Sequence, residues 1–457
     1  MAKLMASIFG PVFSISGEAM TDAGTSKPDL SSSTNAPSAL KSLVVVAIVP
    51  LIVLAGLFWR SPNHRWSDIQ VHQTLGYPMG GDYLQEYVGG FLIQQSKRQQ
   101  LYDAEAFRDV QHDANIVGFS WDEQQFFPAV YPPFWYDAVS PLSNLPYQTA
   151  ATVWLVLMTL MLIAAVWLLN RYANVPAPIL IVMCLAAPVI ESLNAGQKGT
   201  LLLLIISASY VLLRQRRDLL SGLVFALIVF KPHLAIVPGI WMLVTKRWSW
   251  CAGAILGAAA VIIFSFLISP ESISDYANVV LGFGDYVQSG GYNLNESFSC
   301  WSFWQQLVSN SSLAKVLTAV TSLLLLGVSL WSSRSQSGRS VSAVEVDKSF
   351  AAMVIVTMIT SPHLYAYDLT MLILPIGLLT RLALGTKTAS QPAEEGLAQE
   401  RNYTDWLPVG LLILAMFASG AIASFAARSG IQLGVLLLLA ASIAITRPWS
   451  EVIPRAS

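Results

Sequence analysis

Long apolar segments alternate with polar loops along most of this chain, and the loops are of two kinds. One kind collects Arg and Lys, whereas the other collects Asp, His, Tyr, Asn and Gln. Hydrophobic residues make up 54% of the 457 residues and charged residues 12%, which is too little polar surface to solvate a globule of this size. Because a bilayer offers no water to the backbone, segments that cross it must be helices or closed barrels. The pattern predicts an all-α polytopic membrane protein.

About twelve segments are apolar enough to be interpreted as transmembrane helices. Several of them are shorter than the ~20 residues that a perpendicular span needs, so we expect tilted or broken helices among them. Residues 131–146 carry Asp137 and several prolines, which predicts an interfacial or re-entrant element instead of a span. The predicted spans cover residues 43–59, 147–169, 178–190, 200–213, 219–230, 234–245, 250–268, 313–331, 350–360, 369–379, 407–427 and 431–445.

Composition divides the chain into four parts. Residues 1–40 are rich in Ser, Thr, Ala and Pro and predict a disordered cytoplasmic tail. Residues 41–382 form the predicted membrane-embedded core, in which residues 60–146 make a long first extracytoplasmic loop with interfacial helices. Residues 383–406 are expected to be a cytoplasmic linker, and residues 407–457 two C-terminal transmembrane helices with a short tail.

Basic residues occupy alternate loops between the predicted spans. By the positive-inside bias these loops are cytoplasmic, which places both termini in the cytoplasm and the other loops outside a plasma membrane of prokaryotic type. The basic residues that set this orientation are Arg171, Arg214, Arg216, Arg217, Lys246, Arg247, Arg334, Arg339, Lys348, Arg381, Lys387 and Arg447.

The opposite, extracytoplasmic loops receive every unusual polar cluster of the chain. Random placement would spread such clusters over both faces, so their one-sided distribution predicts one composite site assembled from several loops. The clusters are Gly80-Gly81-Asp82-Tyr83, Tyr131-Pro132-Pro133-Phe134, residues 191–198, Lys231-Pro232-His233, residues 269–312, and residues 361–368.

The order of these motifs resembles the GT-C superfamily of membrane glycosyltransferases, and more narrowly glycosyltransferase family 87. The resemblance covers residues 43–379 and includes Asn194-Ala195-Gly196-Gln197 and the late Ser361-Pro362-His363 with Tyr367-Asp368. It implies a GT-C fold and the inverting transfer of a sugar, with mannose expected, from a polyprenyl-phosphate donor. The implied acceptor is an extracytoplasmic lipid-linked sugar or glycan. At one position the chain departs from the family, which commonly has Asn where Lys198 stands.

Asp82 is the candidate general base for such a transfer. Inversion at the anomeric carbon requires one base for the acceptor proton, and the leaving phosphate is too weak a base to need a strong general acid. Gly80 and Gly81 would let the backbone and the acceptor approach each other closely. The alternative is an aspartate that only caps a helix from residue 83 to residue 94.

Three cationic or hydrogen-bonding residues are candidates for the donor phosphate. His363 follows Pro362 at the end of a predicted span, and Lys198 and Lys231 lie at the outer ends of spans. An ammonium at that depth either contacts an anionic ligand or extends toward lipid headgroups, and both interpretations remain open. An apolar groove must in addition hold the isoprenoid chain of the donor.

Six further residues are expected to bind substrate or shape the site. Tyr83, Tyr131 and Gln197 come from the first three clusters, and Tyr365 and Asp368 from the last. Trp301 belongs to the aromatic outer loop, which suits either a sugar face or a headgroup-level anchor. Asp368 is expected to orient His363 or a lysine, and Glu191, Asn194 and Gln197 to share one helical face.

Other functional classes fit the sequence less well. The formal net charge of -1, without a basic patch, gives no footprint for nucleic acid. Neither a zinc-type ligand motif nor a Walker loop occurs, so we expect no structural metal, no cofactor and no nucleotide donor. A divalent ion that aids the phosphate stays an open alternative for which no motif argues. A secondary transporter would need midplane charges and internal repeats, and neither is evident. A lipid-linked glycan polymerase or ligase is the nearest alternative among enzymes.

Overall fold

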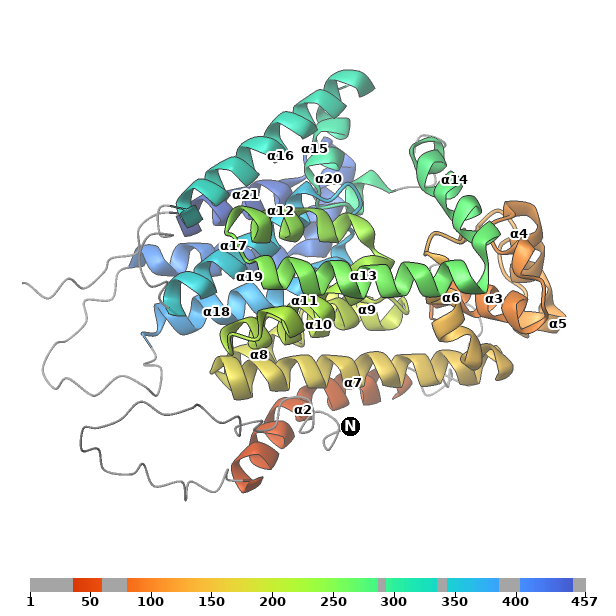
Figure 1. The fold of residues 1–457 in the computed structure, drawn as a ribbon, viewed down its shortest axis with the longest axis horizontal. Helices are drawn as coiled ribbons and strands as arrows, with labels where there is room; N and C mark the ends of the chain where they lie inside the picture. Colours follow the sequence, from red (N-terminus) through yellow and green to blue (C-terminus); the bar gives the residue numbers. More distant parts are fainter. Residues whose placement is uncertain are drawn as a thin grey trace, which may run out of the picture. The chain divides into compact units, whose positions relative to one another are not determined.

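A computed structural model describes residues 36–59, 80–286, 293–308, 310–334, 343–385 and 403–446 (Figure 1). The chain divides into two units, residues 1–39 and 40–457, and all that follows concerns the second. Within the described ranges the elements are α-helices and 3-10 helices, and the only β-type pairing is an isolated bridge between Ser297 and Tyr365. The predicted all-α class is confirmed. Residues 1–35 of the expected tail at residues 1–40 lie outside the described residues, as do most of the linker at residues 383–406 and residues 60–79 of the loop at residues 60–146.

The first elements are α2 (Ala36–Trp59), α3 (Tyr83–Gln94), η1 (Arg98–Gln100), α4 (Ala104–His112), α5 (Ala114–Val117), α6 (Pro133–Val139) and η2 (Ser140–Asn144). The middle of the chain holds α7 (Tyr147–Ala173), α8 (Ala177–Met183), α9 (Ala187–Asn194), α10 (Gly199–Arg214), α11 (Asp218–Phe225), η3 (Ala226–Phe230), η4 (Pro232–Ala235), α12 (Ile236–Val244), α13 (Trp248–Ile268) and α14 (Pro270–Tyr286). The last part holds η6 (Leu294–Glu296), α15 (Cys300–Leu307), α16 (Ser311–Arg334), α17 (Ala343–Thr360), η7 (Ala366–Leu372), α18 (Ile373–Ala383), η8 (Tyr403–Trp406), α19 (Leu407–Phe417), α20 (Ser419–Ser429) and α21 (Leu433–Thr446).

Four helical segments among the described residues are long and apolar enough to cross a membrane: α7, α13, residues 311–333 of α16, and η7 with α18. Two bent pairs, α8 with α9 and α19 with α20, raise the number to six if each pair is one span. Five further apolar helices have 10–17 residues. At 1.5 Å per residue, a helix of this length is shorter than the ~30 Å hydrocarbon core. The predicted number of about twelve spans is therefore not confirmed, although each predicted segment overlaps a helix.

Two of the predicted spans are broken. Residues 178–190 were expected as one segment, but α8 and α9 meet at an angle of 56° around Cys184 and Ala186. Pro188 lies in the first turn of α9, where a residue without a backbone N–H is tolerated and continuation of the preceding helix is not. Residues 407–427 likewise divide into α19 and α20, which are bent by 74°.

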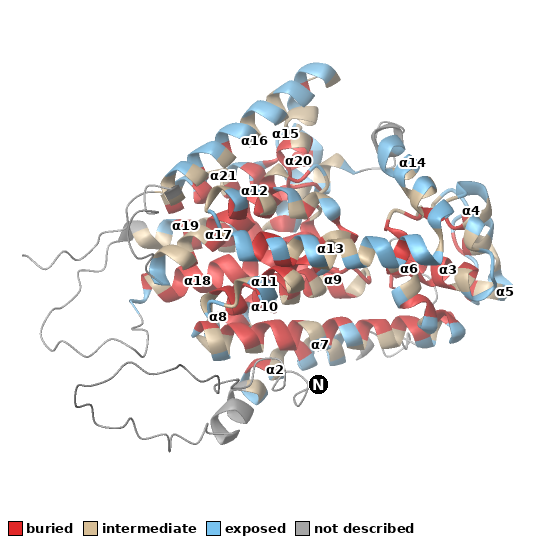
Figure 2. Cartoon of the chain, viewed as in Figure 1, coloured by how far each residue is buried: buried red, intermediate tan, exposed pale blue. Residues whose placement is uncertain are grey.

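The helices differ in how much of their surface other helices cover, and Figure 2 shows the contrast along α18 and α13. The apolar window of η7 and α18 is 89% buried, whereas those of α13 and α16 are each 17% buried. Since the exposed side chains of α13 and α16 are mostly large and apolar, these two helices present the surface that suits lipid. Helices α10, η7 and α18 form the interior.

The described part of the first loop folds into short helices that pack on one another. Helix α3 has the predicted bounds, and it contacts α6 and η2 so closely that a side chain at Gly89 would clash with the Tyr136 ring. Helix α6 has 7 residues and η2 has 5, so neither crosses a membrane. The tight packing of α3 against α6 holds the first residue of α3 next to the site described below.

Candidate active site

Five segments that are distant in sequence meet near the first residues of α10 and η7. They are the turn at Gly80–Asp82 with the start of α3, the segment from Tyr131 to Trp135, the turn at residues 195–198, Lys231 between η3 and η4, and residues 363–368 before and within η7. We call the ionisable residues Asp82, Glu86, Lys198, Lys231 and Asp368 the carboxylate–lysine cluster. The prediction that loops from distant parts of the chain assemble near one another thus holds for these segments.

Glycines allow the first and third segments to interlock. The backbone N–H of Asp82 donates to the carbonyl of Ala195 at 3.0 Å. Gly81 and Gly196 have positive φ angles of 49° and 65°, a region that favours glycine. A Cβ at Gly196 would also lie 2.7 Å from the Cβ of Tyr83 and would clash with the Gly80 carbonyl. The backbone at Asp82 is therefore held directly against the turn that carries Gln197 and Lys198.

The Asp82 side chain is held by Gln197 and does not cap α3. It makes no capping hydrogen bond, and its Oδ2 accepts from Nε2 of Gln197. Asp82 is thus the N-cap residue of α3 by position, as the alternative interpretation expected, but its side chain makes no capping hydrogen bond. Gln197 lies beyond the end of α9, in a turn closed by its own N–H to the Ser192 carbonyl at 2.8 Å. It therefore does not share a helical face with Glu191 and Asn194 as the three-residue spacing predicted, because Gly196 turns the chain first.

Lys198 forms an ion pair with Glu86, and both side chains are completely buried. Trp135 donates its indole N–H to Oε1 of Glu86 at 3.4 Å, and the Lys198 ammonium lies 4.0 Å from the centroid of the Tyr131 ring. Sequence reasoning missed Glu86, although it follows Asp82 by four residues, one helical turn along α3. The role of Lys198 toward a phosphate stays a prediction, and its charge is balanced in this structure.

A second buried ion pair joins Lys231 to Asp368. The ammonium lies 2.7 Å from Oδ1 of Asp368, and the two side chains are 4% and 1% exposed. The other carboxylate oxygen accepts from the backbone N–H of Tyr365 at 3.4 Å, which ties the pair to the start of η7. Asp368 therefore positions a lysine in this structure.

Burial raises the pKa of the Asp82 carboxyl to about 6. The charges of Lys198 and Lys231 act in the opposite direction, and those of Glu86 and Asp368 raise the pKa further. Since each lysine has its own carboxylate partner, their opposing effects largely cancel and the effect of burial prevails. A carboxylate with this pKa is ionised at neutral pH and more basic than an ordinary aspartate, which suits a general base.

His363 lies beside the second ion pair, with its ring centroid 6.1 Å from that of His233 and 5.1 Å from that of Tyr365. Burial, and then the charges of Lys231 and His233, hold the pKa of His363 well below its usual range. The imidazole is therefore neutral at physiological pH. It can contribute a hydrogen-bond donor to a ligand without adding a positive charge.

Aromatic rings surround the cluster. The ring of Tyr83 stacks on that of Trp154 with centroids 5.0 Å apart, and Trp154 donates to the Gly196 carbonyl at 2.8 Å. The ring centroids of Tyr131 and Trp135 are 6.0 Å apart, and Trp135 stacks on Phe230 at 4.7 Å. These contacts fix the two predicted tyrosines at the carboxylate–lysine cluster.

The outer loop is fastened to the segment that carries His363. Phe298 donates its N–H to the Leu364 carbonyl at 2.8 Å, and Asn293 donates its N–H to the Tyr365 hydroxyl at 3.0 Å. Trp301 lies on α15, which packs against α16, α17 and η6. Its contact with a sugar stays a prediction.

Several buried polar atoms of the site have no protein hydrogen-bond partner. They are the Tyr83 hydroxyl, Oε2 of Glu86, Oε1 of Gln197 and Oγ1 of Thr200. An unsatisfied buried polar group typically costs about 1–3 kcal/mol, so a native protein seldom retains several together without a ligand or water to bond them. No group of three or more His, Cys, Asp or Glu side chains in the described ranges could hold a metal ion. The expectation that the site uses no metal stays a prediction.

Comparison with known proteins gives one match. The family model described as glycosyltransferase family 87 matches residues 129–362, just over half of the chain. The matched range includes Tyr131, Gln197, Lys198 and Lys231, and Asp82 precedes it. No curated protein and no solved structure shows a significant match.

Proposed function

This chain belongs to glycosyltransferase family 87 and is thus a membrane-associated glycosyltransferase, and we propose that it is an inverting enzyme with a polyprenyl-phosphate sugar as its donor. The proposed sugar is mannose, and the proposed acceptor is an extracytoplasmic lipid-linked sugar or glycan. The observation that carries the proposal is the Asp82 carboxylate, held by Gln197 where five segments meet and flanked by two lysine ion pairs.

Asp82 acts as general base in the proposed reaction. The acceptor hydroxyl attacks the anomeric carbon, its proton passes to an Asp82 carboxylate oxygen, and the bond from carbon to phosphate oxygen breaks with its electron pair on the phosphate. One displacement of this kind inverts the anomeric configuration. A pKa of about 6 supports the role, because the group is charged at neutral pH yet accepts a proton more readily than an exposed aspartate.

Lys231 and His363 are the proposed ligands of the departing phosphate. Asp368 holds the Lys231 ammonium at 2.7 Å, and an ammonium has two further N–H groups for a phosphate oxygen. The neutral His363 beside it adds an uncharged donor. In this proposal Lys198, whose charge also acts on Asp82, contributes to phosphate binding, with Glu86 lowering its net charge.

Tyr83, Tyr131, Gln197, Tyr365 and Trp301 are the proposed sugar-binding and site-shaping residues. The strongest support concerns Gln197, whose amide N–H holds Asp82 while its oxygen has no protein partner. That oxygen, together with the Tyr83 hydroxyl, offers hydrogen bonds to sugar hydroxyls. We propose no metal or other cofactor.

We propose that the site faces the outside of the plasma membrane and that both termini are cytoplasmic. The carboxylate–lysine cluster lies at the first residues of α10 and η7, whereas Arg214 and Arg381 lie at the far ends of α10 and α18. Two of the predicted cytoplasmic arginines are thus at the opposite end of the same helices, as the positive-inside bias requires. The domain boundaries expected from composition remain part of this proposal.

Transfer from a defined donor tests the function. The purified full chain with polyprenyl-phosphate-mannose and candidate acceptors should release polyprenyl phosphate and form one glycosylated product of inverted configuration. Asp82→Asn should lower turnover by about 10²–10⁴, while Asp109→Asn, an exposed aspartate on α4, should behave as the wild type. If the wild type instead uses only a diphosphate-linked oligosaccharide, the chain is a polymerase or ligase and the proposed donor is wrong.

A further inference from the structure

The loop between α20 and α21 contacts the outer loop that borders the site. Gln432 directly precedes α21, and its side chain is completely buried. Its Nε2 donates to the Asn295 carbonyl at 2.7 Å, and its Oε1 accepts from the backbone N–H of Gly434 at 3.2 Å. Both polar atoms of the amide are therefore bonded, and the side chain joins the start of α21 to η6, 137 positions earlier in the sequence.

Phe298 extends this connection to the proposed phosphate ligand. Its side chain is also completely buried, and a Cβ at Gly434 would clash with its ring, so the start of α21 packs directly on it. Its backbone N–H donates to the Leu364 carbonyl at 2.8 Å. Leu364 directly follows His363. Two hydrogen bonds and one close ring contact thus lead from Gln432 to the segment that carries His363.

Residues 293–298 are bonded on two sides. On one side, Gln306 of α15 donates from Nε2 to the first carbonyl of η6 at 2.7 Å, beside the bond from Gln432. On the other side, the backbone N–H of Asn293 donates to the Tyr365 hydroxyl at 3.0 Å. The segment therefore transmits the position of α15 and α21 to the residues that follow His363.

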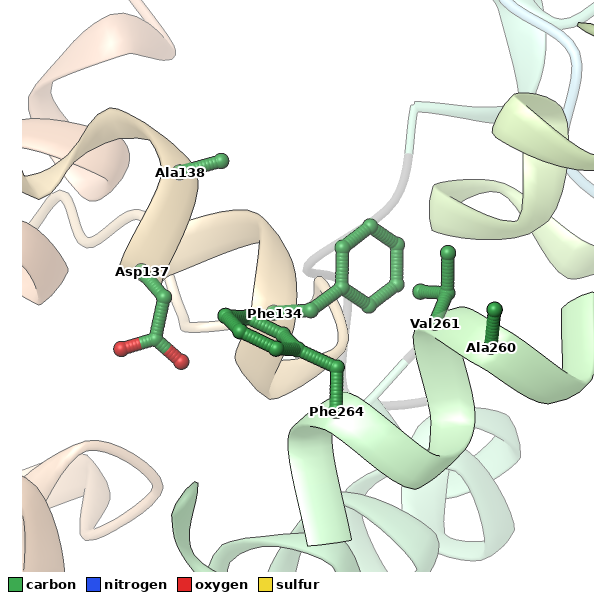
Figure 3. A pocket seen from close by; sticks show the side chains of 6 residues that line it. All are labelled: Phe134, Asp137, Ala138, Ala260, Val261 and Phe264. Atoms are coloured by element: carbon green, nitrogen blue, oxygen red, sulfur yellow. The ribbon is translucent and has the colours of Figure 1, made fainter. Parts of the chain in front are cut away.

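Helices α20 and α21 take no direct part in the features described so far. They lie beyond residues 129–362, which the family model matches, and carry none of the carboxylate–lysine cluster. The groove between α6 and α13, where Phe134 and Phe264 come from opposite walls, is lined by those two helices alone (Figure 3). Any effect of Gln432 on the reaction must therefore pass through the residues that it bonds.

We propose that Gln432 is a positioning residue for the donor phosphate: it holds residues 293–298 in place, and through them Leu364 and the neighbouring His363. The inference rests on the proposed function, because it concerns a phosphate ligand assigned there. An apolar side chain of the same length would fill the space of Gln432 without its hydrogen bond to the backbone carbonyl. The segment would then lose its fixed distance to α21, and His363 its fixed place.

Gln432→Met in the full chain tests the proposal, because methionine matches the length of glutamine and cannot donate to Asn295. We expect the Kd of a polyprenyl phosphate to rise by about two- to tenfold, the usual contribution of one hydrogen bond between uncharged groups. For the lipid-linked donor, kcat/KM should fall by the same factor. In the His363→Ala background the substitution should change neither quantity further, because the group that it positions is already absent.

Leu438→Ala is the matched control, since Leu438 is completely buried on α21 and its truncation leaves the bonds of Gln432 intact. It should lower the thermal midpoint at least as much as Gln432→Met, yet leave the Kd of polyprenyl phosphate unchanged. Hydrogen exchange at the Phe298 amide should be faster in Gln432→Met and unchanged in the control. If Gln432→Met does not fold, Gln432→Asn, whose amide is one methylene shorter, takes its place.

Three results would overturn the proposal: an unchanged Kd in Gln432→Met, an equal rise in Leu438→Ala, or the same further loss in the His363→Ala background. If the wild type binds polyprenyl phosphate but transfers no sugar from polyprenyl-phosphate-mannose, the proposed function fails, and the Kd values still decide the role of Gln432. If the wild type binds no polyprenyl phosphate, both proposals fail.

Discussion

Two buried ionic clusters occupy opposite ends of the same helices. In only one of them does every buried polar side-chain atom have a hydrogen-bond partner. At the far end of α10 and α18 lies the arginine cluster, which consists of Tyr210, Arg214, Asp347 and Arg381. Asp347 accepts hydrogen bonds from Tyr210 and Arg381 and lies 3.1 Å from Arg214. Each arginine also bonds a backbone carbonyl, which joins the ends of α7, α10, α17 and α18. One carboxylate with three donors leaves little capacity for a ligand.

The carboxylate–lysine cluster is built differently. Each lysine has its own carboxylate partner, which leaves Asp82 with one side-chain hydrogen bond, from Gln197. Around it, Oε2 of Glu86 and the Tyr83 hydroxyl have no protein partner. A protein optimised only for stability would bond these groups, because each unsatisfied one costs about 1–3 kcal/mol. The contrast indicates that the arginine cluster stabilises the fold and that the carboxylate–lysine cluster is arranged for a substrate.

Asp82→Asn should give the largest loss of activity in the chain. A positioned general base typically contributes about 10²–10⁴ in rate, and the amide cannot accept the acceptor proton. Because the variant also removes a buried charge, its thermal midpoint at pH 7 should equal or exceed that of the wild type. Initial rates of polyprenyl phosphate release and a melting curve in detergent measure both effects. Wild-type turnover in this variant would remove Asp82 from its role.

Asp347→Asn should instead lower stability, because it leaves Arg214 and Arg381 without a counter-charge. Breaking a buried ion pair costs about 3–5 kcal/mol, and the lower value applies here since the Arg214 side chain is 17% exposed. Activity per folded molecule should change far less than in Asp82→Asn. If Asp347→Asn lost activity at unchanged thermal midpoint, the division between the two clusters would be wrong.

The pH dependence of kcat/KM should further distinguish the carboxylate–lysine cluster from the arginine cluster. Since Asp82 must be anionic to accept a proton and its pKa is raised to about 6, kcat/KM should fall about tenfold per pH unit below pH 6. The raised pKa also means that the folded chain binds this proton more tightly than the unfolded chain. The contribution of Asp82 to stability therefore declines as the pH rises from about 4 to about 6. Residual activity of Asp82→Asn should lack the acidic limb, and an unchanged limb would assign it to another group.

Of these four predictions, the one for Gln197→Ala has the smallest expected effect. It removes the one side-chain hydrogen bond to Asp82, and loss of a bond to a charged group is worth about 1.5 kcal/mol, or about tenfold in kcat. Gln124→Ala, at an exposed position of the first loop, is the matched control. Equal kinetics of the two variants would mean that Gln197 does not position the base.

The part of the fold that follows from local pattern was predictable from the sequence. Apolar composition predicted an all-helical membrane protein, and the bounds of α3 agree with residues 83–94. The number of spans did not follow, because apolar content does not reveal whether a segment continues or breaks. Pro188 breaks the segment at residues 178–190, and α19 and α20 are bent at Ala418, next to Ser419 and Gly420, a pair of a kind that often accompanies a helix kink.

The candidate site was predictable as a set of loops but not as a network of partners. Sorting polar clusters to one face placed Asp82, Gln197, Lys231 and Asp368 together, and the structure joins them in pairs. The sequence analysis did not identify Glu86, because a single glutamate within a helix is commonly interpreted as a solvent-exposed residue. Its pairing with Lys198 links residues 112 positions apart, and single-sequence patterns carry no information on such contacts.

In the proposed mechanism Asp82, Lys231 and His363 act on one substrate, at the end of α10 that begins with Gly199. A density map of the full chain with a non-hydrolysable polyprenyl-phosphate-mannose analogue tests it most directly. We expect the phosphate within hydrogen-bonding distance of Lys231 or His363, and the anomeric carbon facing Asp82. A phosphate bound at Arg214 and Arg381 instead, or Asp82 beyond the reach of any hydroxyl that could attack the sugar, would contradict the account.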